Sequence, residues 1–444
     1  MSISSGLQLA QLNDYLKPST ACVQPAEIQT ELSLDDCLAC SGCITSAESM
    51  LVNMQTGEQL IEQVESKGER YCIISTQSVL AISKHFQLDV QETWSKLHTF
   101  MNVQFKATVI DINKGRMLSL RLTAEELINR SNTNSPLSPL PKGKATDAIL
   151  KSHFQNSQIP MFVTACPGWV CYAEKTHPYL LPLLSTTKSP QQLSGVLCKH
   201  IYASNPKDTY TFCVMPCYDK KLEAARPYHG VDDIKDVDLV LTTAELIKLI
   251  SKFNVDFKSL NNAQVEPLQR TLGLGSGGYS EYVFLYVLQS VYKIPILQLQ
   301  PNAQFNEYAI QITDKKGLDL REYVLLKDGN SIFKVVSAFG FRHIQNIVRN
   351  LKRKGASDCH FYEVMACPGG CLNGGGQLNI VGEKTVLSPL ESKAWIKEMI
   401  STYGSLLETQ IENTEYDLTA QLLKTQFMTI TEREATAVDV VNTW

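Results

Sequence analysis

The chain has 444 residues, 44% of them hydrophobic, and carries a formal net charge of −4 at pH 7. This length suffices for two or three units that each bury a core. A slightly acidic chain has no general attraction for nucleic acid or an anionic membrane, and no run approaches the ~20 apolar residues of a membrane-spanning helix. We therefore expect neither nucleic acid nor a membrane as a partner.

The start of the chain, MSISSGLQLAQLNDYL, lacks the basic segment and continuous apolar stretch of an export signal. Thirteen cysteines in a chain without such a signal indicate a reducing compartment, where thiols remain available to metals. We expect a cytoplasmic protein, with the nucleus as a further location.

The first motif in chain order is a cysteine triplet, Cys37, Cys40 and Cys43, with Cys22 upstream of it. Two-residue spacers let three thiolates converge on different irons of one small cluster, and a distant cysteine completes a [4Fe–4S] site. Zinc sites more often present separate Cys-x2–4-Cys pairs. The spacing favours an iron–sulfur cluster, with zinc or accidental clustering as the alternatives.

Alternating strands and helices follow the triplet. Short β-branched runs predict buried strands, and amphipathic stretches such as residues 243–253 and 343–354 predict helices between them. The predicted strands are residues 70–75, 106–112, 161–165, 211–215, 238–242, 333–338 and 361–366. Such alternation indicates an α/β fold of parallel sheets covered by helices.

The chain divides into three predicted regions. Residues 1–66 form a turn-rich segment around the triplet, residues 67–385 form the α/β body, and residues 386–444 form a helical C-terminal region with a tail. Within the body, the polar, proline-rich stretch 131–144 indicates a loop or a linker between lobes.

Four more cysteines stand where predicted strands end. Cys166 lies in TACPGWV, Cys217 in VMPCYDK, and Cys367 and Cys371 in VMACPGGCLNGGG. Ligands of open α/β sheets collect beyond the carboxyl ends of the strands, so these turns can converge. The glycines let the backbone approach a bulky inorganic group without β-carbon clashes. The pattern predicts a second cluster; the alternative is that buried cysteines act as small hydrophobic residues.

These motifs resemble the signatures of a known family. TACPGWV, MPCYDKKLE and MACPGGCLNGGGQ are similar to the three motifs of [FeFe]-hydrogenases. With SGLQLAQLNDYLKPSTACV and DCLACSGCITSAE, the chain more closely resembles the hydrogenase-like proteins of cytosolic iron–sulfur assembly, the nuclear prelamin A recognition factor-like family. The resemblance implies a two-lobed hydrogenase-like core, with an N-terminal cluster segment and a helical C-terminal tail.

The resemblance also implies two [4Fe–4S] clusters, each held by four cysteines. The ligands would be Cys22, Cys37, Cys40 and Cys43 for the first cluster, and Cys166, Cys217, Cys367 and Cys371 for the second. In related hydrogenases the cysteine at the position of Cys371 also bridges to a di-iron subsite. A lysine at the position of Lys220 holds a cyanide ligand there, and Met215 and Met365 match residues near that subsite. The resemblance thus implies a partly retained pocket.

Two positions depart from the hydrogenase pattern. Hydrogenases carry two adjacent cysteines in the first motif, and the earlier one relays protons; here that position is Ala165. A methyl group cannot carry a proton, so hydrogen chemistry would lose its terminal acid–base group. The motif STQS (75–78) also lacks the proline usual in hydrogenases. Both departures argue against an enzyme that turns over hydrogen.

Two features have competing interpretations. The stretch Gly273-Leu-Gly-Ser-Gly-Gly278 fits the pattern G-x-G-x-x-G, yet no clear strand precedes it. A tight turn near the lobe of the second cluster is therefore favoured over dinucleotide binding. Lys220 either points into the ligand pocket or forms an i,i+3 ion pair with Glu223.

The last residue, Trp444, combines an indole with the terminal carboxylate, which suits docking on a partner. The alternative is a frayed or internally packed terminus. Members of the resembled family often end in tryptophan after an acidic residue, where this chain has Thr443. The resemblance implies two partners, the cytosolic iron–sulfur assembly scaffold and the targeting complex.

We interpret the protein as a non-enzymatic factor of iron–sulfur cluster assembly. It would relay or stabilise [4Fe–4S] clusters between the scaffold and the targeting complex, for delivery to cytosolic and nuclear apo-proteins. Because Cys22 lies in a loop-rich segment apart from the triplet, the first cluster should be the more exposed and labile of the two. The alternatives are an active [FeFe]-hydrogenase or other redox enzyme, and a binding module that senses oxygen or iron.

Overall fold

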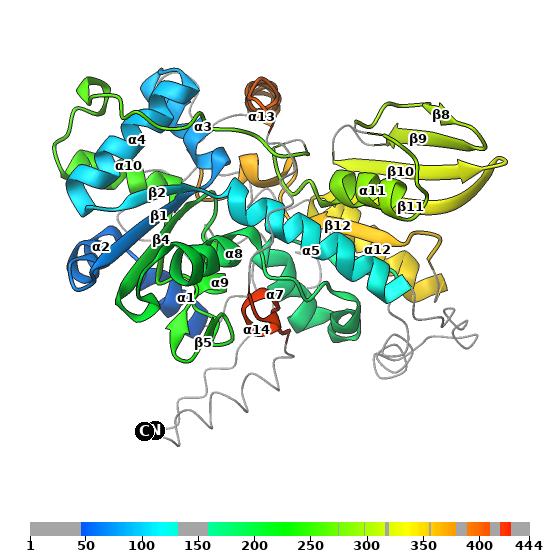
Figure 1. Ribbon diagram of the computed structural model, residues 1–444, viewed down its shortest axis with the longest axis horizontal. Helices are drawn as coiled ribbons and strands as arrows, with labels where there is room; N and C mark the ends of the chain where they lie inside the picture. Colours follow the sequence, from blue (N-terminus) through cyan, green and yellow to red (C-terminus); the bar gives the residue numbers. More distant parts are fainter. Residues whose placement is uncertain are drawn as a thin grey trace, which may run out of the picture.

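Two sheets, each flanked by helices, make up the two lobes of the molecule (Figure 1). In the computed structural model the described residues are 46–131, 159–273, 275–296, 298–315, 319–354, 357–378, 389–408 and 418–427. The long helix α5 (Asn113–Ser131) runs between the lobes and packs on α8 (Pro190–Leu197) and α11 (Tyr279–Ser290). None of the helices in these ranges is long and apolar enough to cross a membrane.

The first sheet has four strands, all parallel, in the order β2–β1–β4–β7. Its strands are β1 (Glu69–Ile74), β2 (Thr108–Asp111), β4 (Thr209–Met215) and β7 (Leu239–Thr242). All residues of β4 are buried, as expected for a central strand covered on both faces, whose sequence is a continuous apolar run. Each of the four strands coincides with a run predicted from the sequence, and this part of the α/β prediction is confirmed.

Helices cover both faces of the first sheet. One face carries α2 (Gly57–Val64), α3 (Thr76–Phe86), α4 (Val90–Phe105) and α10 (Thr243–Lys252). The other face carries α9 (Asp219–Ala224) and α1 (Ser46–Asn53), which packs on α9. Local signals start these helices. Thr242 and Glu245 form a capping box at α10, and the Asp89 carboxylate accepts the Gln91 amide at α4.

The second sheet has six strands in the order β3–β12–β11–β10–β9–β8. They are β3 (Met161–Val163), β8 (Gln304–Phe305), β9 (Tyr308–Asp314), β10 (Leu320–Lys327), β11 (Asn330–Phe339) and β12 (Phe361–Met365). β3, β12 and β11 are parallel, whereas β11, β10, β9 and β8 pair antiparallel. The antiparallel half was not predicted. It exists because the two-residue turn Asp328-Gly329, with φ of 50° and 78°, joins β10 to β11, and such a turn connects only antiparallel strands.

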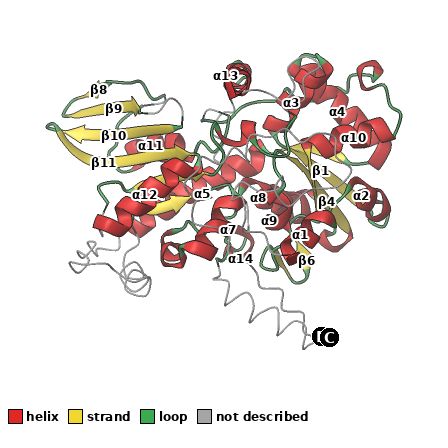
Figure 2. Cartoon of the chain, turned by 180° about the vertical axis from the view of Figure 1, so that it is seen from behind, coloured by secondary structure: helices red, strands yellow, loops and turns green. Residues whose placement is uncertain are grey.

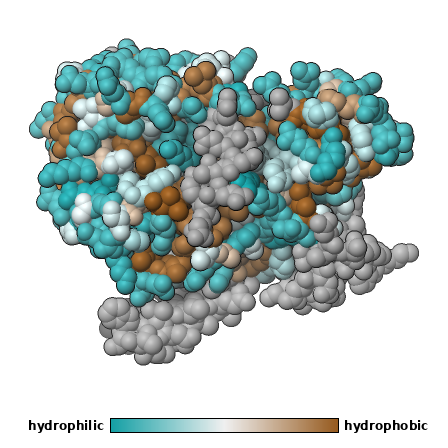
Figure 3. Space-filling view, viewed as in Figure 1, coloured by the Kyte–Doolittle hydropathy of each residue, from teal (hydrophilic) through white to brown (hydrophobic). Residues whose placement is uncertain are grey.

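Three helices pack around the second sheet and two more follow in the C-terminal region. The first three are α7 (Pro167–Thr176), α11 and α12 (Phe341–Lys354), and the others are α13 (Pro389–Gly404) and α14 (Ala420–Leu423). A small hairpin, β5 (Gly230–Val231) and β6 (Ile234–Lys235), lies beside α14. Figure 2 shows α13 and α14 at opposite edges of the molecule. The outer surface of both lobes is largely hydrophilic on the face drawn in Figure 3.

Candidate functional site

The three cysteine-bearing turns lie at the carboxyl ends of parallel strands from both sheets. Cys166 follows β3 and Cys367 follows β12, its neighbour in the second sheet, whereas Cys217 follows β4 in the first sheet. Cys371 lies in the short helix η7 (Gly370–Asn373), one turn beyond Cys367. Cys166, Cys217 and Cys371 are close enough for their charges to interact. The structure therefore brings turns of both lobes to one place, as the sequence predicts.

Burial keeps the thiols of Cys166 and Cys217 protonated by raising their pKa. It raises the pKa of Cys166 to about 12, with a further contribution from Asp219, and raises the pKa of Cys217 well above its usual value. Lys220 opposes the rise at Cys217. Among the described residues, no three His, Cys, Asp or Glu side chains converge on one point as a single metal ion requires.

Glycines set the spacing between the turns of the two sheets. A β-carbon at Gly374 would lie 2.3 Å from the Pro216 carbonyl oxygen, and one at Gly376 would lie 2.6 Å from a Thr242 methyl and 3.2 Å from the α-carbon of Cys217. Gly376 also donates its amide to the Pro216 carbonyl at 2.9 Å. We expected these glycines to admit an inorganic group. The close approach that the structure shows is to the protein backbone of the turn that holds Cys217.

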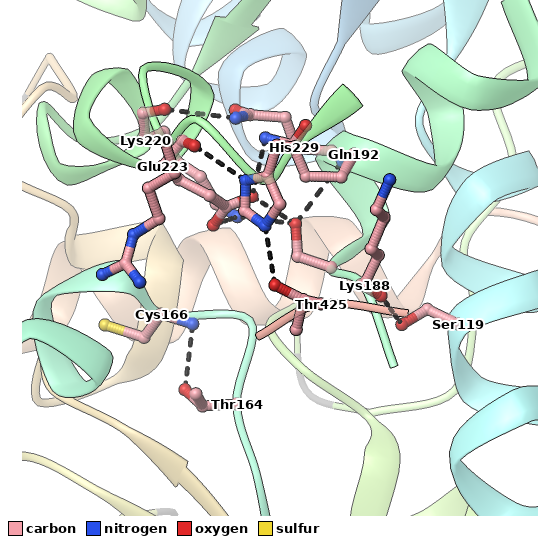
Figure 4. A network of polar contacts seen from close by, with 12 residues as sticks. Ser119, Thr164, Cys166, Lys188, Gln192, Lys220, Glu223, His229 and Thr425 are labelled. Carbon is pink, nitrogen blue, oxygen red and sulfur yellow. Dashed lines mark hydrogen bonds and ion pairs between the residues drawn. The ribbon is translucent and has the colours of Figure 1, made fainter. Parts of the chain in front are cut away.

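Lys220 takes part in an ion pair. Its Nζ lies 2.8 Å from Glu223 Oε2 and 3.4 Å from Ser189 Oγ. Figure 4 shows Lys220 and Glu223 next to each other. Burial disfavours the charged carboxylate of Glu223, yet Lys220 and His229 lower its pKa. Burial likewise works against the Lys220 ammonium, but Glu223 raises its pKa. Of the two interpretations of Lys220, the ion pair is confirmed.

A pocket lies beside Cys166, and Ala165 is part of its wall. Thr164 positions this turn, because its hydroxyl donates to the Val364 carbonyl at 2.6 Å and accepts the Cys166 amide at 2.9 Å (Figure 4). The opposite wall includes Arg226, whose guanidinium is 3.0 Å from each oxygen of Glu174. Ala165 offers this pocket no group that can donate or accept a proton.

The glycine-rich loop after Arg270 is a contact between lobes. No strand precedes it, and α11 follows it. Arg116 of α5 is buried and donates to the Gly277 carbonyl at 2.6 and 3.0 Å and to the Leu272 carbonyl at 3.3 Å. A β-carbon at Gly277 would meet Glu363 and Met365. The interpretation as a tight turn near the second quartet is confirmed, and the described residues on either side of Leu274 form no βαβ unit for a dinucleotide.

The N-terminal quartet, Cys22, Cys37, Cys40 and Cys43, lies outside the described residues, as does Trp444. The described chain begins with α1, whose end is tied to α9. Gln55 accepts the Val240 amide at 3.0 Å and donates to the Lys221 carbonyl at 2.9 Å, and the Lys221 ammonium lies 2.6 Å from the Gln55 carbonyl. This connection was not predicted, because three positions far apart in sequence form it.

Comparison with solved structures supports the fold. One [FeFe]-hydrogenase, solved in a study of oxygen inactivation, matches with a TM-score of 0.62 at 20% identity, over 84% of this chain and 98% of its own. A variant of apo [FeFe]-hydrogenase HydA1 from Chlamydomonas reinhardtii matches with a TM-score of 0.58 at 20% identity, over 86% and 99% of the two chains. At such identity the likeness concerns the fold.

Sequence comparison gives the family. The model for "Iron only hydrogenase large subunit, C-terminal domain" matches residues 69–375. The cytosolic Fe-S cluster assembly factor narfl of Xenopus tropicalis is 34% identical over 441 residues, 86% of each chain. Cytosolic iron-sulfur assembly component 3 of Rattus norvegicus is 34% identical over 84% of each chain, and the NAR1 homolog of Schizosaccharomyces japonicus is 29% identical over 99%. The chain therefore belongs to the hydrogenase-like family of cytosolic iron–sulfur cluster assembly factors.

Proposed function

We propose that this protein is a cytosolic iron–sulfur cluster assembly factor that holds two [4Fe–4S] clusters. It relays or stabilises clusters between the assembly scaffold and the targeting complex, for delivery to cytosolic and nuclear apo-proteins. The observation that carries the proposal is the group of cysteine turns beside Ala165: the thiols of a cluster site are present, and the proton-carrying group of a hydrogenase is missing at this position.

The described residues fit a cluster better than a single ion. Cys166, Cys217 and Cys371 are near enough for a thiolate at one to raise the pKa of another, yet no three such side chains in the described ranges meet at one point. A four-iron cluster places its cysteine ligands on separate irons and so spreads them apart. Thiols must lose their protons to bind metal, and Lys220 favours the thiolate of Cys217. Cys367, in the same turn as Cys371, is the fourth ligand of this set.

The two sites would differ in accessibility. Cys166 is only 8% exposed and lies in a wall shared with the core of the second lobe. Cys217, Cys367 and Cys371 are partly exposed, but a cluster held there would exchange slowly, because Cys166 cannot be reached without local opening. We assign delivery to the N-terminal site of Cys22, Cys37, Cys40 and Cys43, and a stabilising role to the second site.

The proposal is tested by anaerobic purification followed by iron and sulfide analysis and EPR. About eight irons per chain, two cluster signals and no hydrogen evolution with reduced viologen would support it. About ten irons with infrared bands of cyanide ligands would support a hydrogenase instead. Transfer is tested by incubating the loaded protein with an apo-acceptor whose activity requires a [4Fe–4S] cluster. If partner affinity changed with cluster oxidation but no cluster reached the acceptor, the protein would be a sensing module.

A further inference from the structure

The pocket beside Cys166 is built from four separate pieces of chain. These are the turn after β3 with the start of α7, the segment 184–189 before α8, the end of α9 with the segment after it, and residues 418–427, which we call the C-terminal strap. Cys166 lies in the first piece, Thr187 in the second, His229 in the third, and Thr425 and Phe427 of the strap in the fourth. One wall of a pocket that contains a predicted cluster ligand thus belongs to a peripheral segment near the end of the chain.

The backbone of the strap pairs with the segment before α8. The Lys188 amide donates to the Leu423 carbonyl at 3.0 Å, and the Thr425 amide donates to the Thr186 carbonyl at 2.6 Å. The pairing is an antiparallel bridge of two backbone hydrogen bonds. So short a ladder is marginal without side-chain anchors.

Lys424 provides the first side-chain anchor. Its ammonium lies 3.1 Å from Glu126 Oε2 of α5 and 3.3 Å from the Thr187 hydroxyl. Burial works against the Glu126 carboxylate, but Arg130 and Lys424 lower its pKa to about 2. The carboxylate that receives the strap is therefore charged at neutral pH.

Thr425 provides the second anchor, through His229 (Figure 4). The Nδ1 of His229 lies 2.8 Å from the Glu223 carbonyl oxygen, which can only accept, so Nδ1 carries the proton. Nε2 is then the acceptor, and the Thr425 hydroxyl donates to it at 2.9 Å. The strap is thus bonded to the segment that follows α9, next to the Lys220–Glu223 pair.

Opening the strap costs less than separating the lobes. Leu422 is the one buried residue of the strap, and its other residues are half-buried or exposed. Separating the lobes would instead break the buried contacts of Arg116 with the glycine-rich loop and the hydrogen bond from Gln377 to the Gln77 carbonyl. Segments with few buried contacts open locally and at low free energy.

We propose that the C-terminal strap is a detachable cover of the pocket beside Cys166, and that its release, without separation of the lobes, gives small reagents access to Cys166, the buried member of the second cysteine quartet. In its reference to a bound cluster the proposal rests on the proposed function. The detachment itself concerns only residues of this chain.

The test compares three full-length proteins. The strap variant combines Lys424→Met, Thr425→Val and Phe427→Ala. The matched control combines Lys252→Met, Thr402→Val and Leu407→Ala, which remove an ammonium, a hydroxyl and a hydrophobic side chain at exposed or half-buried positions outside the strap. Hydrogen exchange by mass spectrometry reports opening of residues 418–427 and 185–188. Loss of the EPR signal of the second cluster to an iron chelator reports access, in a Cys40→Ser background that removes the first cluster.

In the strap variant we expect about tenfold faster exchange in both segments and about tenfold faster cluster loss, because an ion pair and a partly buried hydrogen bond are removed. The control should match the unaltered chain in both measurements. Unchanged exchange would overturn the proposal, since the named contacts would then not hold the strap. Faster exchange with unchanged cluster loss would also overturn it, since the strap would then not control access.

Failure of the proposed function is recognised separately. If the purified protein holds no iron, the proposal that it binds clusters is wrong. Access is then measured by the rate at which iodoacetamide alkylates Cys166, followed by peptide mass spectrometry. Faster alkylation in the strap variant than in the control would support the detachable strap. Equal rates would overturn it.

Discussion

Lys220 and Glu223 form a buried ion pair, 2.8 Å from Nζ to Oε2, on the helix that follows Cys217. In a hydrogenase-like fold, a lysine at this position is expected to face a ligand of the metal subsite. Here its ammonium is directed to a carboxylate and to Ser189. The contribution of this buried pair to stability is measurable.

Glu223→Gln should destabilise the protein by about 3 kcal/mol, because removing one member of a buried pair leaves the Lys220 charge uncompensated. Urea unfolding of the full chain measures the change. Glu58→Gln, at the exposed pair with Lys252, is the matched control and should cost less than about 1 kcal/mol. Equal effects of the two variants would show that the Lys220–Glu223 pair is no more important than a surface contact.

Cys217→Ser should lower the iron content by about four per chain and remove one EPR signal, because a four-iron cluster loses one of its cysteine ligands. Cys359→Ser is the control. Cys359 is buried, whereas Cys217 is partly exposed; Cys359 donates to the Phe361 carbonyl and lies outside the three turns. Unchanged iron in Cys217→Ser would remove this residue from the ligand set.

Gly374→Ala should disturb the second site without changing any thiol. The new β-carbon would lie 2.3 Å from the Pro216 carbonyl oxygen, so the turn that carries Cys217 must move away. We expect loss of about four irons and a lower thermal midpoint. Gly404→Ala is the control, since nothing lies within 4 Å of a β-carbon there. Normal cluster content in Gly374→Ala would mean that the turns can shift without cost to binding.

His229 and His98 should each lower the stability as the pH falls from 6.5 towards 4, against an opposing contribution from Asp111 and Asp236, whose pKa values burial raises to about 6. Burial lowers the pKa of His229 to about 4 and that of His98 to about 4. Within this window the unfolded chain binds protons at the two histidines that the folded chain does not, so their protonation favours unfolding, with a slope of up to about 1.4 kcal/mol per pH unit for each histidine. Urea unfolding across this range measures the slope. His229→Gln should reduce it and leave the part due to His98; an unchanged slope would show that His229 is not held neutral.

Arg116→Met should loosen the contact between the lobes. The change removes hydrogen bonds to the Gly277 and Leu272 carbonyls, and leaving buried carbonyls unpaired costs about 2 kcal/mol or more. Hydrogen exchange in residues 270–278 should increase. Arg342→Met, at an exposed position of α12, is the control. If exchange rose equally in both variants, Arg116 would have no special role at this loop.

The elements that could be predicted are those whose signal is local. The strands that precede Cys166, Cys217 and Cys367 are short, mostly apolar runs, and prolines and glycines mark the turns after them. The antiparallel strands of the second sheet were missed because they are only partly buried, although Asp328-Gly329 is a hairpin signal. Arg116, Gln55 and the strap were missed for another reason. Their partners lie tens to hundreds of positions away, and no local pattern records such contacts.

Gln55 is bonded to α9, and this limits the distance between the N-terminal triplet and the first lobe. Helix α1 spans eight residues, or about 12 Å at 1.5 Å each, and the two residues from Asn53 to Gln55 and the three from Cys43 to Ser46 add at most about 18 Å. Whatever path the intervening residues take, the α-carbon of Cys43 remains within about 30 Å of Gln55. The covalent chain thus limits how far the N-terminal triplet can lie from Gln55. Spin labels at Cys43 and Gln55 would report a separation within the range of pulsed dipolar spectroscopy.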